Sequence, residues 1–455
     1  MSKIDPKIFH AYDVRGVYPG EINEAAVFDI AAALVEFLRK KFKTSEPRIV
    51  VGRDSRLSSP KLFDFFVQGA LSRGAAIIDV GLVPTDALYF ASNHLGVEAG
   101  AMITASHNPS RYNGIKIIVK GQRMLSGDWG WPQIKKLVLK ENFGPTTVAR
   151  KKIRRYNITP DYSKRVLSLI DKRRIKKMKI IIDAGNGVGS IMVKNVIKEL
   201  PFDVVYLNCR LDGNSPSHPP DPLIKENIRE LCQEVIRRKA DFGLALDGDG
   251  DRTIFVDEKG KSVSSDLIIV LFARYYLSKR PGSAIVYNLT CSKTVPEMIR
   301  HYGGKPVKTR TGHSFMKEAC KKYQAIFGGE IAGHFYFRDF YYAECSGLAL
   351  ALMAEILSMA GKPLSLLVKE VKHYYRLGEI NFKIKDCQAA MKRAANLYSS
   401  GKQKWLDGLT VEFKDWWFNL RPSNTEPLLR LVIEANDKKT AEKRLKEIKN
   451  AIKGK

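Results

Sequence analysis

The sequence predicts an α/β protein with three related α/β domains and a smaller C-terminal α+β domain. Its 455 residues are enough for three or four domains of roughly 100–200 residues, each able to bury a core. Apolar runs of strand length alternate with helical periodicity almost throughout, which is typical of layered α/β proteins. The strand–helix–strand layout recurs at roughly 100-residue spacing, which indicates a repeat on the scale of a domain.

The first unit carries four strand candidates. They are the runs RIVVG, AAIIDVG, AGAMITA and GIKIIV, at residues 48–52, 75–81, 99–105 and 114–119. The amphipathic stretch at residues 59–74 lies between the first two runs and is expected to be a helix.

The second and third units repeat this pattern. The second contains MKIIIDAGNGVGS, FDVVYLN and ADFGLALDGDGDR, at residues 178–190, 202–208 and 240–252, and the third covers residues 283–330. The glycines at residues 183–190 resemble a dinucleotide fingerprint, but their spacing is loose, so we expect a tight strand-to-helix turn. We place the domains at residues 1–150, 151–255, 256–369 and 370–455.

The tail differs from the three repeats. Residues 409–435 predict two strands around a turn, followed by a basic helix, and this antiparallel α+β arrangement would form a lid. The most apolar helix candidate, residues 347–361, contains Glu355 and is too short to cross a bilayer. We therefore expect it to be a core helix, and we expect no association with a membrane.

The chain is strongly basic, with 76 Lys and Arg against 48 Asp and Glu and a net charge of +28. A generally basic surface, a cationic cleft for phosphorylated substrates and a nucleic-acid interface would each contribute to this excess. The basic residues are spread along the chain, with clusters at residues 150–155 and 171–179, and the sequence has no zinc-finger spacing. This distribution disfavours a nucleic-acid partner.

Cysteine usage and the N-terminal residues predict a cytoplasmic protein. The sequence MSKIDPKIFH has a charge at its third position and lacks the apolar segment of a signal peptide. In a chain of this length, cysteines without a CxxC pair are expected to be reduced and mostly buried. The six are Cys209, Cys232, Cys291, Cys320, Cys345 and Cys387.

The sharpest motif is DGDGDR, which directly follows the apolar run FGLAL. Asp247, Asp249 and Asp251 alternate with glycines that permit tight turns, so their carboxylates can surround one hard cation such as Mg²⁺. A plain Gly-Asp hairpin turn is the alternative, but three close carboxylates repel one another unless a cation neutralises them. Water or a phosphate oxygen must complete the cation's shell, and Arg252 beside the triplet could hold a further phosphate.

Ser106, in the stretch ITASHNPSRYNGIKI, could carry such a phosphate. It follows an apolar strand, where catalytic loops of α/β sheets gather, and His107 comes directly after it. A serine hydrolase would show Gly-x-Ser-x-Gly, which is absent here. A polar Asn-Pro turn is the alternative for this stretch taken alone.

Two further loops have the chemistry of sugar-phosphate binding. RPSNTEP, at residues 421–427, offers a guanidinium, hydroxyls and an amide that can form a phosphate nest, with an Asx or Pro turn as the alternative. GGEIAGH, at residues 328–334, places Glu330 and His334 among flexible glycines. A carboxylate there could accept two neighbouring sugar hydroxyls, and a surface Glu on a glycine loop is the alternative.

AYDVRG, TASHNP, DGDGDR, GGEIAGH and RPSNTEP, in this order, resemble the α-D-phosphohexomutase superfamily over essentially the whole chain. GGEIAGHFYFRDF and FNLRPSNTEPLLRL are most similar to bacterial phosphomannomutases, including those that also act on glucose phosphates. The resemblance implies a central cleft surrounded by four domains, three of them with mixed sheets. It also implies interconversion of mannose 6-phosphate and mannose 1-phosphate through a phosphoserine and a hexose 1,6-bisphosphate. Mg²⁺ would be the cofactor, and the enzyme would be a monomer or a homodimer.

The resemblance also implies roles for individual residues. Ser106 matches the phosphoserine and, with Asp247, Asp249 and Asp251, the Mg²⁺ ligands. Arg252 and His107 match neighbours of the phosphoserine, while Arg15 and Lys116 match residues that assist proton transfer and hold the reacting phosphate. The matches on the substrate side are His313, Glu330, His334, Arg421, Ser423, Asn424, Thr425 and Arg430.

The sugar loop departs from the family pattern, because Ala332 stands where Ser is common in Gly-Glu-x-Ser-Gly-His. A lost neutral hydrogen bond is worth about 0.5–1.5 kcal/mol, so sugar selection would relax rather than fail. No motif visibly reads C2 of the sugar, so glucose and glucosamine phosphates stay open as substrates. A glucosamine mutase more often has a DGDADR-like loop. From another class, a basic nucleic-acid-binding protein on a mutase fold is the alternative.

Overall fold

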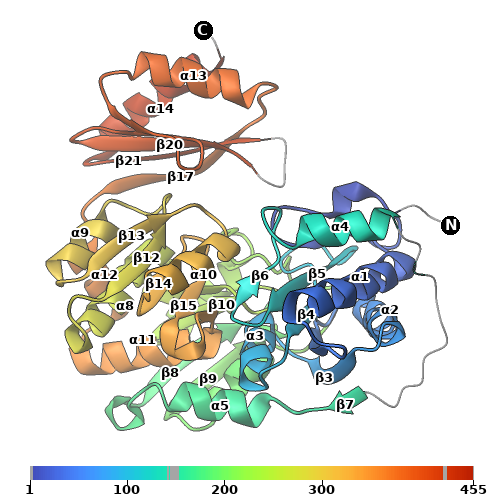
Figure 1. Cartoon of the computed structure of the whole chain (residues 1–455). Helices are drawn as coiled ribbons and strands as arrows, with labels where there is room; N and C mark the ends of the chain where they lie inside the picture. The colour runs from blue at the N-terminus through green and yellow to red at the C-terminus, as the bar shows by residue number, and fades with distance from the viewer. Residues whose placement is uncertain (1–3, 141–142, 144–152, 424–427, 454–455) are drawn as a thin grey trace.

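The computed structural model describes residues 4–140, 143, 153–423 and 428–453. Four sheets, of seven, four, five and five strands, follow one another along the chain. We call the units built on them domains I to IV, and Figure 1 shows domain IV beside domain III, with its own sheet and two covering helices. Three α/β domains with mixed sheets and a smaller C-terminal α+β domain confirm the predicted fold class.

Domain I has the longest sheet, in the order β1-β5-β4-β2-β3-β7, with β6 paired to β5. Its central strands β2, β3 and β4 are parallel, whereas β5 is antiparallel to both β1 and β4. The strands are β1 (Val14–Val17), β2 (Arg48–Arg53), β3 (Ala76–Leu82), β4 (Ala99–Ile103), β5 (Tyr112–Val119), β6 (Arg123–Met124) and β7 (Ile153–Arg155). The helices are η1 (Pro6–Ile8), α1 (Glu24–Phe42), α2 (Ser59–Ser72), α3 (Thr85–His94) and α4 (Trp131–Lys140).

The edge of this sheet brings two loops together. In the parallel pair β2–β4, Arg53 lies opposite Ile103, so both strands end at the same edge. The amide of Asp54 then donates to the carbonyl of Ile103 at 3.0 Å. The loops at residues 54–58 and 104–111 therefore leave the sheet side by side.

Domain II presents the aspartate motif from a buried strand. Its sheet order is β11-β10-β8-β9, in which β8, β9 and β10 are parallel and β11 is antiparallel to β10. Every residue of β10 is buried, so the loop that follows it starts inside the molecule. The elements are α5 (Thr159–Leu167), η3 (Lys172–Arg174), β8 (Met178–Asp183), α6 (Gly189–Ile197), β9 (Phe202–Leu207), α7 (Arg229–Arg237), β10 (Phe242–Leu246) and β11 (Thr253–Asp257).

Domain III repeats the layout with the sheet order β13-β12-β14-β15-β16. A tight turn joins β14 to β15, where the amide of Glu330 donates to the carbonyl of His334 at 2.9 Å. The strands are β12 (Ala284–Asn288), β13 (Lys305–Thr309), β14 (Phe327–Gly329), β15 (Phe335–Phe337) and β16 (Ala343–Glu344). The helices are α8 (Ser265–Lys279), α9 (Thr294–His301), α10 (His313–Lys322), η4 (Arg338–Phe340), α11 (Ser346–Ala360) and α12 (Leu364–Val371).

The apolar helix α11 is a core helix, as the sequence predicts. Glu355, its one acidic residue, is fully buried and accepts a hydrogen bond from the Tyr275 hydroxyl at 2.9 Å. Among the described residues, no single helix is both long enough and apolar enough to span a bilayer. Only α11 and α12 taken together would satisfy both conditions, and they meet at 85°.

Domain IV is antiparallel, with the sheet order β17-β21-β20-β19-β18. The prediction of two strands in residues 409–435 was wrong, because three strands form there. Residues 413–415 make a turn, in which the Phe413 amide donates to the Trp416 carbonyl at 2.9 Å. The elements are β17 (Tyr375–Phe382), α13 (Cys387–Leu397), β18 (Lys402–Lys404), β19 (Leu409–Glu412), β20 (Trp416–Pro422), β21 (Leu429–Ala435) and α14 (Lys438–Lys453).

Candidate active site

Ser106 is buried in the loop that follows β4. Its backbone has a φ of +53°, in the left-handed region that residues other than glycine seldom occupy. Its amide donates to Thr104 Oγ1 at 2.9 Å. The Ser106 hydroxyl donates to Asp247 Oδ2 at 2.9 Å and lies 3.2 Å from His107 Nδ1. The serine oxygen is therefore held against the first aspartate of the DGDGDR loop.

The three aspartates of that loop form a compact, buried cluster. Each offers a carboxylate oxygen within 4.8 Å of the other two. Glycine suits the two positions between them, because Gly250 has a φ of +73° and a Cβ on Gly248 would lie 2.6 Å from the Ser106 carbonyl oxygen. We call Asp247, Asp249 and Asp251 the aspartate triad.

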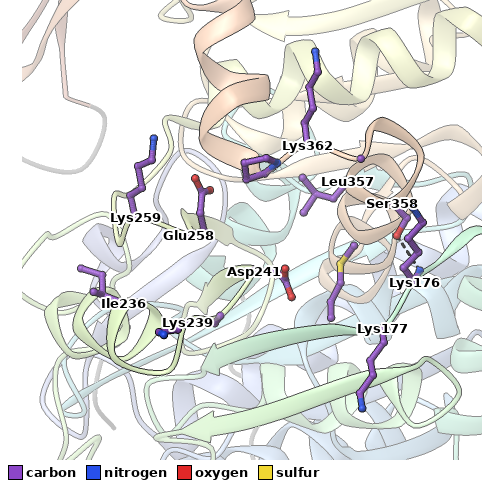
Figure 2. Close-up of a pocket in the computed structure, with 14 residues that line it drawn as sticks. Lys176, Lys177, Ile236, Lys239, Asp241, Glu258, Lys259, Leu357, Ser358 and Lys362 are labelled. Carbon is purple, nitrogen blue, oxygen red and sulfur yellow. Dashed lines mark hydrogen bonds between the residues drawn. The ribbon is translucent and has the colours of Figure 1, made fainter.

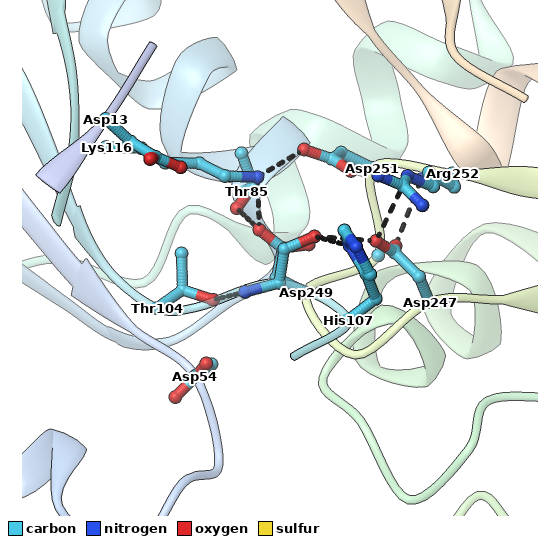
Figure 3. A network of polar contacts seen from close by, with 12 residues as sticks. Asp13, Asp54, Thr85, Thr104, His107, Lys116, Asp247, Asp249, Asp251 and Arg252 are labelled. Carbon is cyan, nitrogen blue, oxygen red and sulfur yellow. Dashed lines mark hydrogen bonds and ion pairs between the residues drawn. The ribbon is translucent and has the colours of Figure 1, made fainter. Parts of the chain in front are cut away.

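Lys116, from β5, inserts its ammonium group between two members of the triad. Its Nζ lies 2.6 Å from Asp249 Oδ2 and 2.7 Å from Asp251 Oδ2, and Figure 3 shows both contacts. Burial would lower the pKa of Lys116, but the charges of Asp249 and Asp251 outweigh it and raise this pKa above its ordinary value. Lys116 therefore brings a positive charge between Asp249 and Asp251.

The carboxylates of the triad differ in their electrostatic surroundings. Burial, together with repulsion from Asp251 and Asp249, raises the pKa of Asp247 well above its ordinary value. Burial acts on Asp251 in the same direction, but there Lys116 and His334 outweigh it and lower the pKa well below the ordinary value. The triad thus needs nearby positive charge to stay ionised.

The oxygen donors of the triad fit the hard cation that the sequence predicts. All three carboxylates are buried and close enough to share one ion. Asp249 Oδ1 has no hydrogen-bond partner among the described residues, while its Oδ2 accepts from the Thr85 hydroxyl at 2.6 Å. The Thr85 amide also donates to the Asp249 carbonyl at 2.8 Å, so the first turn of α3 holds the loop in place.

His107 lies beside the serine oxygen, and Arg252 lies beside Asp247, which binds that oxygen. Arg252 Nε is 3.8 Å from Asp247 Oδ2, and Arg252 Nη1 is 3.7 Å from Asp221 Oδ1. Burial and the positive charges of Arg252 and Arg15 lower the pKa of His107 well below its ordinary value. His107 is therefore a neutral ring next to the serine hydroxyl.

Arg15 approaches the serine loop from β1. Its Nη1 donates to Asn108 Oδ1 at 2.7 Å, and its Nη2 donates to Asp13 Oδ2 at 2.6 Å.

His313 begins α10 and packs edge-on against the Tyr12 ring with 5.4 Å between ring centroids. Burial and the charge of Lys116 lower the pKa of His313 to about 3.

Glu330 and His334 connect the sugar loop of domain III to the triad. His334 Nε2 lies 3.2 Å from Asp251 Oδ1, and its Nδ1 lies 3.3 Å from Glu330 Oε2. Burial opposes the charge on His334, but Asp251 and Glu330 raise its pKa to about 10. Burial also opposes the charge on Glu330, but hydrogen bonding to His334 lowers its pKa to about 2. The two groups form a buried ion pair.

The predicted phosphate-binding residues lie on domain IV. Arg421 and Arg430 face each other on β20 and β21, and both bind Glu379 of β17, at 2.7 and 3.1 Å. A register shift between Leu377 and Ile380 places Glu379 in a bulge of β17. Ser423 follows β20, and its amide donates to the Leu428 carbonyl at 2.8 Å. Asn424 and Thr425 lie outside the described residues.

Three domains therefore supply one continuous polar cluster. Domain I contributes the serine loop, Lys116 and Arg15, domain II contributes the triad and Arg252, and domain III contributes the Glu330–His334 pair. The sequence analysis missed several residues that hold this cluster. They are Asp54, Arg56, Thr85 and Asp221. Asp54 and Arg56 follow the strand RIVVG directly, so the strand-end rule could have found them.

A separate cavity of about 720 Å³ lies elsewhere, between domains II and III (Figure 2). Met178 and Leu357 line its apolar part, and lysines such as Lys176 and Lys239 surround it. None of the residues predicted for the site lines this cavity. The candidate site therefore rests on the polar cluster around Ser106.

Comparison with protein families finds four matches in chain order. Three carry the description phosphoglucomutase/phosphomannomutase alpha/beta/alpha domain, numbered I, II and III, and match residues 6–143, 160–260 and 264–375. The C-terminal domain of the same family matches residues 379–451. The chain belongs to the phosphoglucomutase/phosphomannomutase family. The resemblance that the five motifs predict is thereby confirmed.

Members of this family match the chain over nearly its whole length. Phosphohexose mutases of Xanthomonas campestris pv. campestris are 37% identical over 450 residues, covering 98% of this chain and 99% of the relative. A phosphomannomutase of Methanocaldococcus jannaschii is 37% identical over 453 residues, covering 98% of both chains. Among solved structures, a phosphoglucomutase/phosphomannomutase family protein of Burkholderia thailandensis has a TM-score of 0.89 at 30% identity, covering 99% of this chain and 98% of that one.

Proposed function

We propose that this family member is a phosphohexomutase that interconverts mannose 6-phosphate and mannose 1-phosphate through a phosphoserine at Ser106. One observation carries the proposal: the buried Ser106 hydroxyl lies 2.9 Å from a triad of aspartates suited to a hard cation. Its curated relatives named phosphomannomutase support the choice of sugar.

The proposed reaction consists of two phosphoryl transfers. A free hydroxyl of the hexose phosphate attacks the phosphorus on Ser106, the bond between phosphorus and the Ser106 oxygen breaks, and the hydroxyl proton leaves. The product is a bound hexose 1,6-bisphosphate. After the sugar reorients, the Ser106 oxygen attacks the phosphorus of the other phosphate. The bond between that phosphorus and the sugar oxygen breaks, the sugar oxygen takes back a proton, and the isomeric hexose monophosphate is released while the phosphoserine is regenerated.

Residues around Ser106 support this chemistry by their positions. The Asp247, Asp249 and Asp251 carboxylates, with an oxygen at Ser106, would hold Mg²⁺. When bound, this ion would neutralise negative charge that develops on the transferring phosphoryl group. Arg252 adds a second positive charge beside Asp247.

Proton relay and orientation of the phosphoryl group are assigned to residues of domain I. Lys116 reaches the triad, and Arg15 is fixed to the serine loop through Asn108. Both stand where they can hold the phosphoryl oxygens and pass on the hydroxyl proton. His107, a neutral ring 3.2 Å from the serine oxygen, orients that oxygen.

Substrate recognition is divided between domains III and IV. Glu330 and His334, with His313 nearby, are assigned to the sugar hydroxyls. The phosphate that does not react is assigned to a loop of domain IV, because a guanidinium pair there suits a phosphate dianion. Its residues are Arg421, Ser423, Asn424, Thr425 and Arg430.

The choice of sugar is tested by direct competition. The protein is supplied with Mg²⁺, traces of hexose 1,6-bisphosphate and, in parallel, the 1-phosphates of mannose, glucose and glucosamine. We expect the highest kcat/KM with mannose 1-phosphate. Faster turnover of glucosamine 1-phosphate would favour a phosphoglucosamine mutase, and salt-sensitive DNA binding without mutase activity would favour a nucleic-acid-binding protein.

The nucleophile is tested with two serine variants. Intact-mass measurement after exposure to hexose 1,6-bisphosphate should show one phosphoryl group on the protein. Ser106→Ala should abolish both this modification and mutase turnover. Ser110→Ala, which changes an exposed serine of the same loop, should leave both unchanged. Turnover of Ser106→Ala at the rate of the unmodified sequence would refute the assignment.

The setting of the enzyme completes the proposal. All six cysteines are unpaired, which supports a reducing compartment such as the cytoplasm. We place the protein there as a monomer or homodimer that takes phosphorylated hexoses and has no nucleic-acid or membrane partner.

A further inference from the structure

Arg56 is a buried residue in the loop that follows β2, and the chemistry described above does not use it. Its guanidinium group points at the backbone of the serine loop. Arg56 Nη2 donates to the carbonyls of Ser106 and Asn108 at 2.7 and 2.6 Å. Arg56 Nη1 donates to the carbonyls of Pro109 and Tyr112 at 2.8 and 3.0 Å. One side chain thus binds three carbonyl groups of the serine loop and the carbonyl of the first residue of β5.

A carboxylate fixes the fifth donor of the same guanidinium. Arg56 Nε donates to Asp54 Oδ2 at 3.0 Å, while Asp54 Oδ1 accepts from the Arg56 amide at 3.1 Å and from the Ser59 hydroxyl at 2.5 Å. A guanidinium has five N–H groups, and all five are satisfied here. The ion pair is almost fully buried, with the two side chains 7% and 2% exposed. Arg56 is therefore held rigidly as a bracket between two neighbouring loops.

The bracket acts on the part of the serine loop whose geometry is least ordinary. Ser106 itself adopts a φ of +53°, and its carbonyl oxygen lies 2.6 Å from the place where a Cβ of Gly248 would be. The DGDGDR loop at residues 247–252 is called the metal loop from here on. Its backbone confines the Ser106 carbonyl on one side, and Arg56 binds this carbonyl on another. A loop in a sparsely populated conformation persists only where its surroundings over-determine it.

We propose that Arg56 is a positioning residue: it sets the backbone of the serine loop so that the Ser106 oxygen faces the aspartate triad. Arg56 would touch neither the sugar nor the transferring phosphoryl group. The kinetic part of this inference rests on the proposed mutase function, whereas the structural part does not.

Lysine cannot replace arginine in this role. Its ammonium group offers three donors from one atom, whereas Arg56 spans four carbonyls with the planar fork of two nitrogens. Arg56→Lys would keep the charge beside Asp54 but would leave part of the loop unbound. The variant therefore separates the bracket from the ion pair.

The test compares Arg56→Lys with Arg48→Lys. Arg48 serves as the control because it begins β2, the strand that precedes the Arg56 loop. It pairs with Glu98 at 3.3 Å and donates to the Gly96 carbonyl at 2.6 Å, away from the serine loop. Arg56→Lys should lower kcat about 10–100-fold, since a misplacement of about 1 Å can reduce a rate by that order. The KM for mannose 1-phosphate should change less than about threefold, and Arg48→Lys should leave both constants unchanged.

Hydrogen exchange of the unliganded protein provides a readout besides activity. Amides at residues 106–112 should exchange faster in Arg56→Lys than in the unmodified protein, and exchange in β10 should stay unchanged. Suppose that the protein without substitutions is phosphorylated at Ser106. Equal amide exchange and equal kcat in Arg56→Lys and in that protein would then overturn the inference. If the protein without substitutions shows neither mutase activity nor phosphorylation, the proposed function fails. Amide exchange alone then tests whether Arg56 positions the serine loop.

A second variant covers the case in which Arg56→Lys does not fold. Asp54→Asn keeps the size of the side chain but removes the charge that orients Arg56 Nε. We expect a smaller loss in kcat, with faster exchange confined to the same loop. Slower turnover without faster exchange in the loop would contradict a positioning role.

Discussion

At the scale of single residues, the candidate site is a balance of buried charges. The ammonium of Lys116 contacts Asp249 and Asp251, and the imidazolium of His334 contacts Asp251. Arg252 lies beside Asp247, the third carboxylate of the triad. Each carboxylate thus has a positive neighbour, which helps these charges to stay inside the protein. Removing one member should therefore disturb the ionisation of the others.

Asp249 is the member chosen to test whether the triad binds a metal. Asp249→Asn keeps an oxygen that can accept from Thr85 but removes the charge that would face Mg²⁺. We expect the Mg²⁺ concentration for half-maximal activity to rise at least about tenfold, because the ligand charge sets the affinity for a hard cation. Activity is measured across a Mg²⁺ titration.

Asp203→Asn serves as the control, because Asp203 is an exposed carboxylate of the same domain. It should leave the Mg²⁺ titration unchanged. A titration for Asp249→Asn that overlays the one for the unmodified protein would show that the triad does not bind the metal.

The sequence identified most members of this site, and the reason is positional. Ser106 and the triad follow buried apolar strands, and the ends of parallel strands gather at one edge. Arg56 also follows a buried strand, so the strand-end rule could have found it, although its backbone partners come together only on folding. Glu379 was not found, because its partners lie on neighbouring strands that only the folded chain places beside it. Glu379 also lies in a β-bulge, and the alternation of polar and apolar residues along a strand does not predict where a bulge occurs.

At the scale of elements, two loops determine the geometry of the site. The serine loop leaves β4 and the metal loop leaves β10, and they touch at the Ser106 carbonyl and Gly248. The strands and helices on either side were predictable from their periodicity, since each is long and strongly patterned. The third strand in residues 409–435 was not predictable. The short turn at residues 413–415 begins with Phe413 and precedes two tryptophans, so it resembles the interior of a strand.

Gly248→Ala tests the contact between these loops. The added Cβ would lie 2.6 Å from the Ser106 carbonyl oxygen, a distance that backbone atoms must relieve by moving. We expect the metal loop to move away from the serine, with kcat falling by a factor on the order of 100. Steady-state kinetics measures this effect.

Gly20→Ala is the matched control, because nothing lies within 4 Å of its added Cβ. It should leave kcat unchanged. Equal kcat for Gly248→Ala and the unmodified protein would mean that the close approach of the loops has no part in the chemistry.

At the scale of the whole molecule, buried polar contacts join the α/β domains. Lys317 of α10 and Glu344 of β16, each 1% exposed, form an ion pair at 2.7 Å in domain III. The same ammonium lies 3.5 Å from the centroid of the Tyr89 ring of domain I. The pair therefore stands at the seam between domains I and III.

Lys317→Met should destabilise this seam. Glu344 would be left as an unpaired buried charge, which typically costs about 3–5 kcal/mol. The double variant Lys317→Met with Glu344→Leu should recover most of that loss, because it buries no charge. Urea denaturation measures the free energy of unfolding of the transition that includes domains I and III.

Lys172→Met is the control, because the pair Lys172–Glu199 is exposed and surface pairs are worth about 0–1 kcal/mol. A loss of similar size for Lys172→Met and Lys317→Met would contradict the role of burial. So would a double variant no more stable than Lys317→Met alone.

Asp86 joins all three α/β domains. On α3 of domain I, its Oδ2 accepts from the Tyr162 hydroxyl of domain II at 2.7 Å and from the Ser346 amide of domain III at 3.1 Å. Burial raises its pKa from 3.8 to about 7, although hydrogen bonds from Tyr162 and Ser346 act against the rise. The folded protein therefore binds a proton at Asp86 in a range where the unfolded chain does not.

This pKa predicts a stability that falls with rising pH. The contribution of Asp86 is most favourable below about pH 4, decreases through about pH 7 and is constant above it, a change on the order of 4 kcal/mol. Asp86→Asn should remove this dependence, so the variant should gain stability relative to the unmodified protein between pH 4.5 and pH 8. Urea denaturation at several pH values measures the difference, with the exposed Asp64→Asn as control. A difference independent of pH would be the contrary result.

The bulge that carries Glu379 has a consequence for a chain of net charge +28. Any anion that binds Arg421 and Arg430 must displace the Glu379 carboxylate, which belongs to the same sheet. Because it is tethered there, this carboxylate competes at a high local concentration. Weakly bound anions such as chloride should fail to displace this carboxylate, whereas a hexose phosphate with several further contacts should displace it. Replacement of Glu379 by Gln should therefore make inhibition by sulfate stronger, and unchanged inhibition would show that the tethered carboxylate screens nothing.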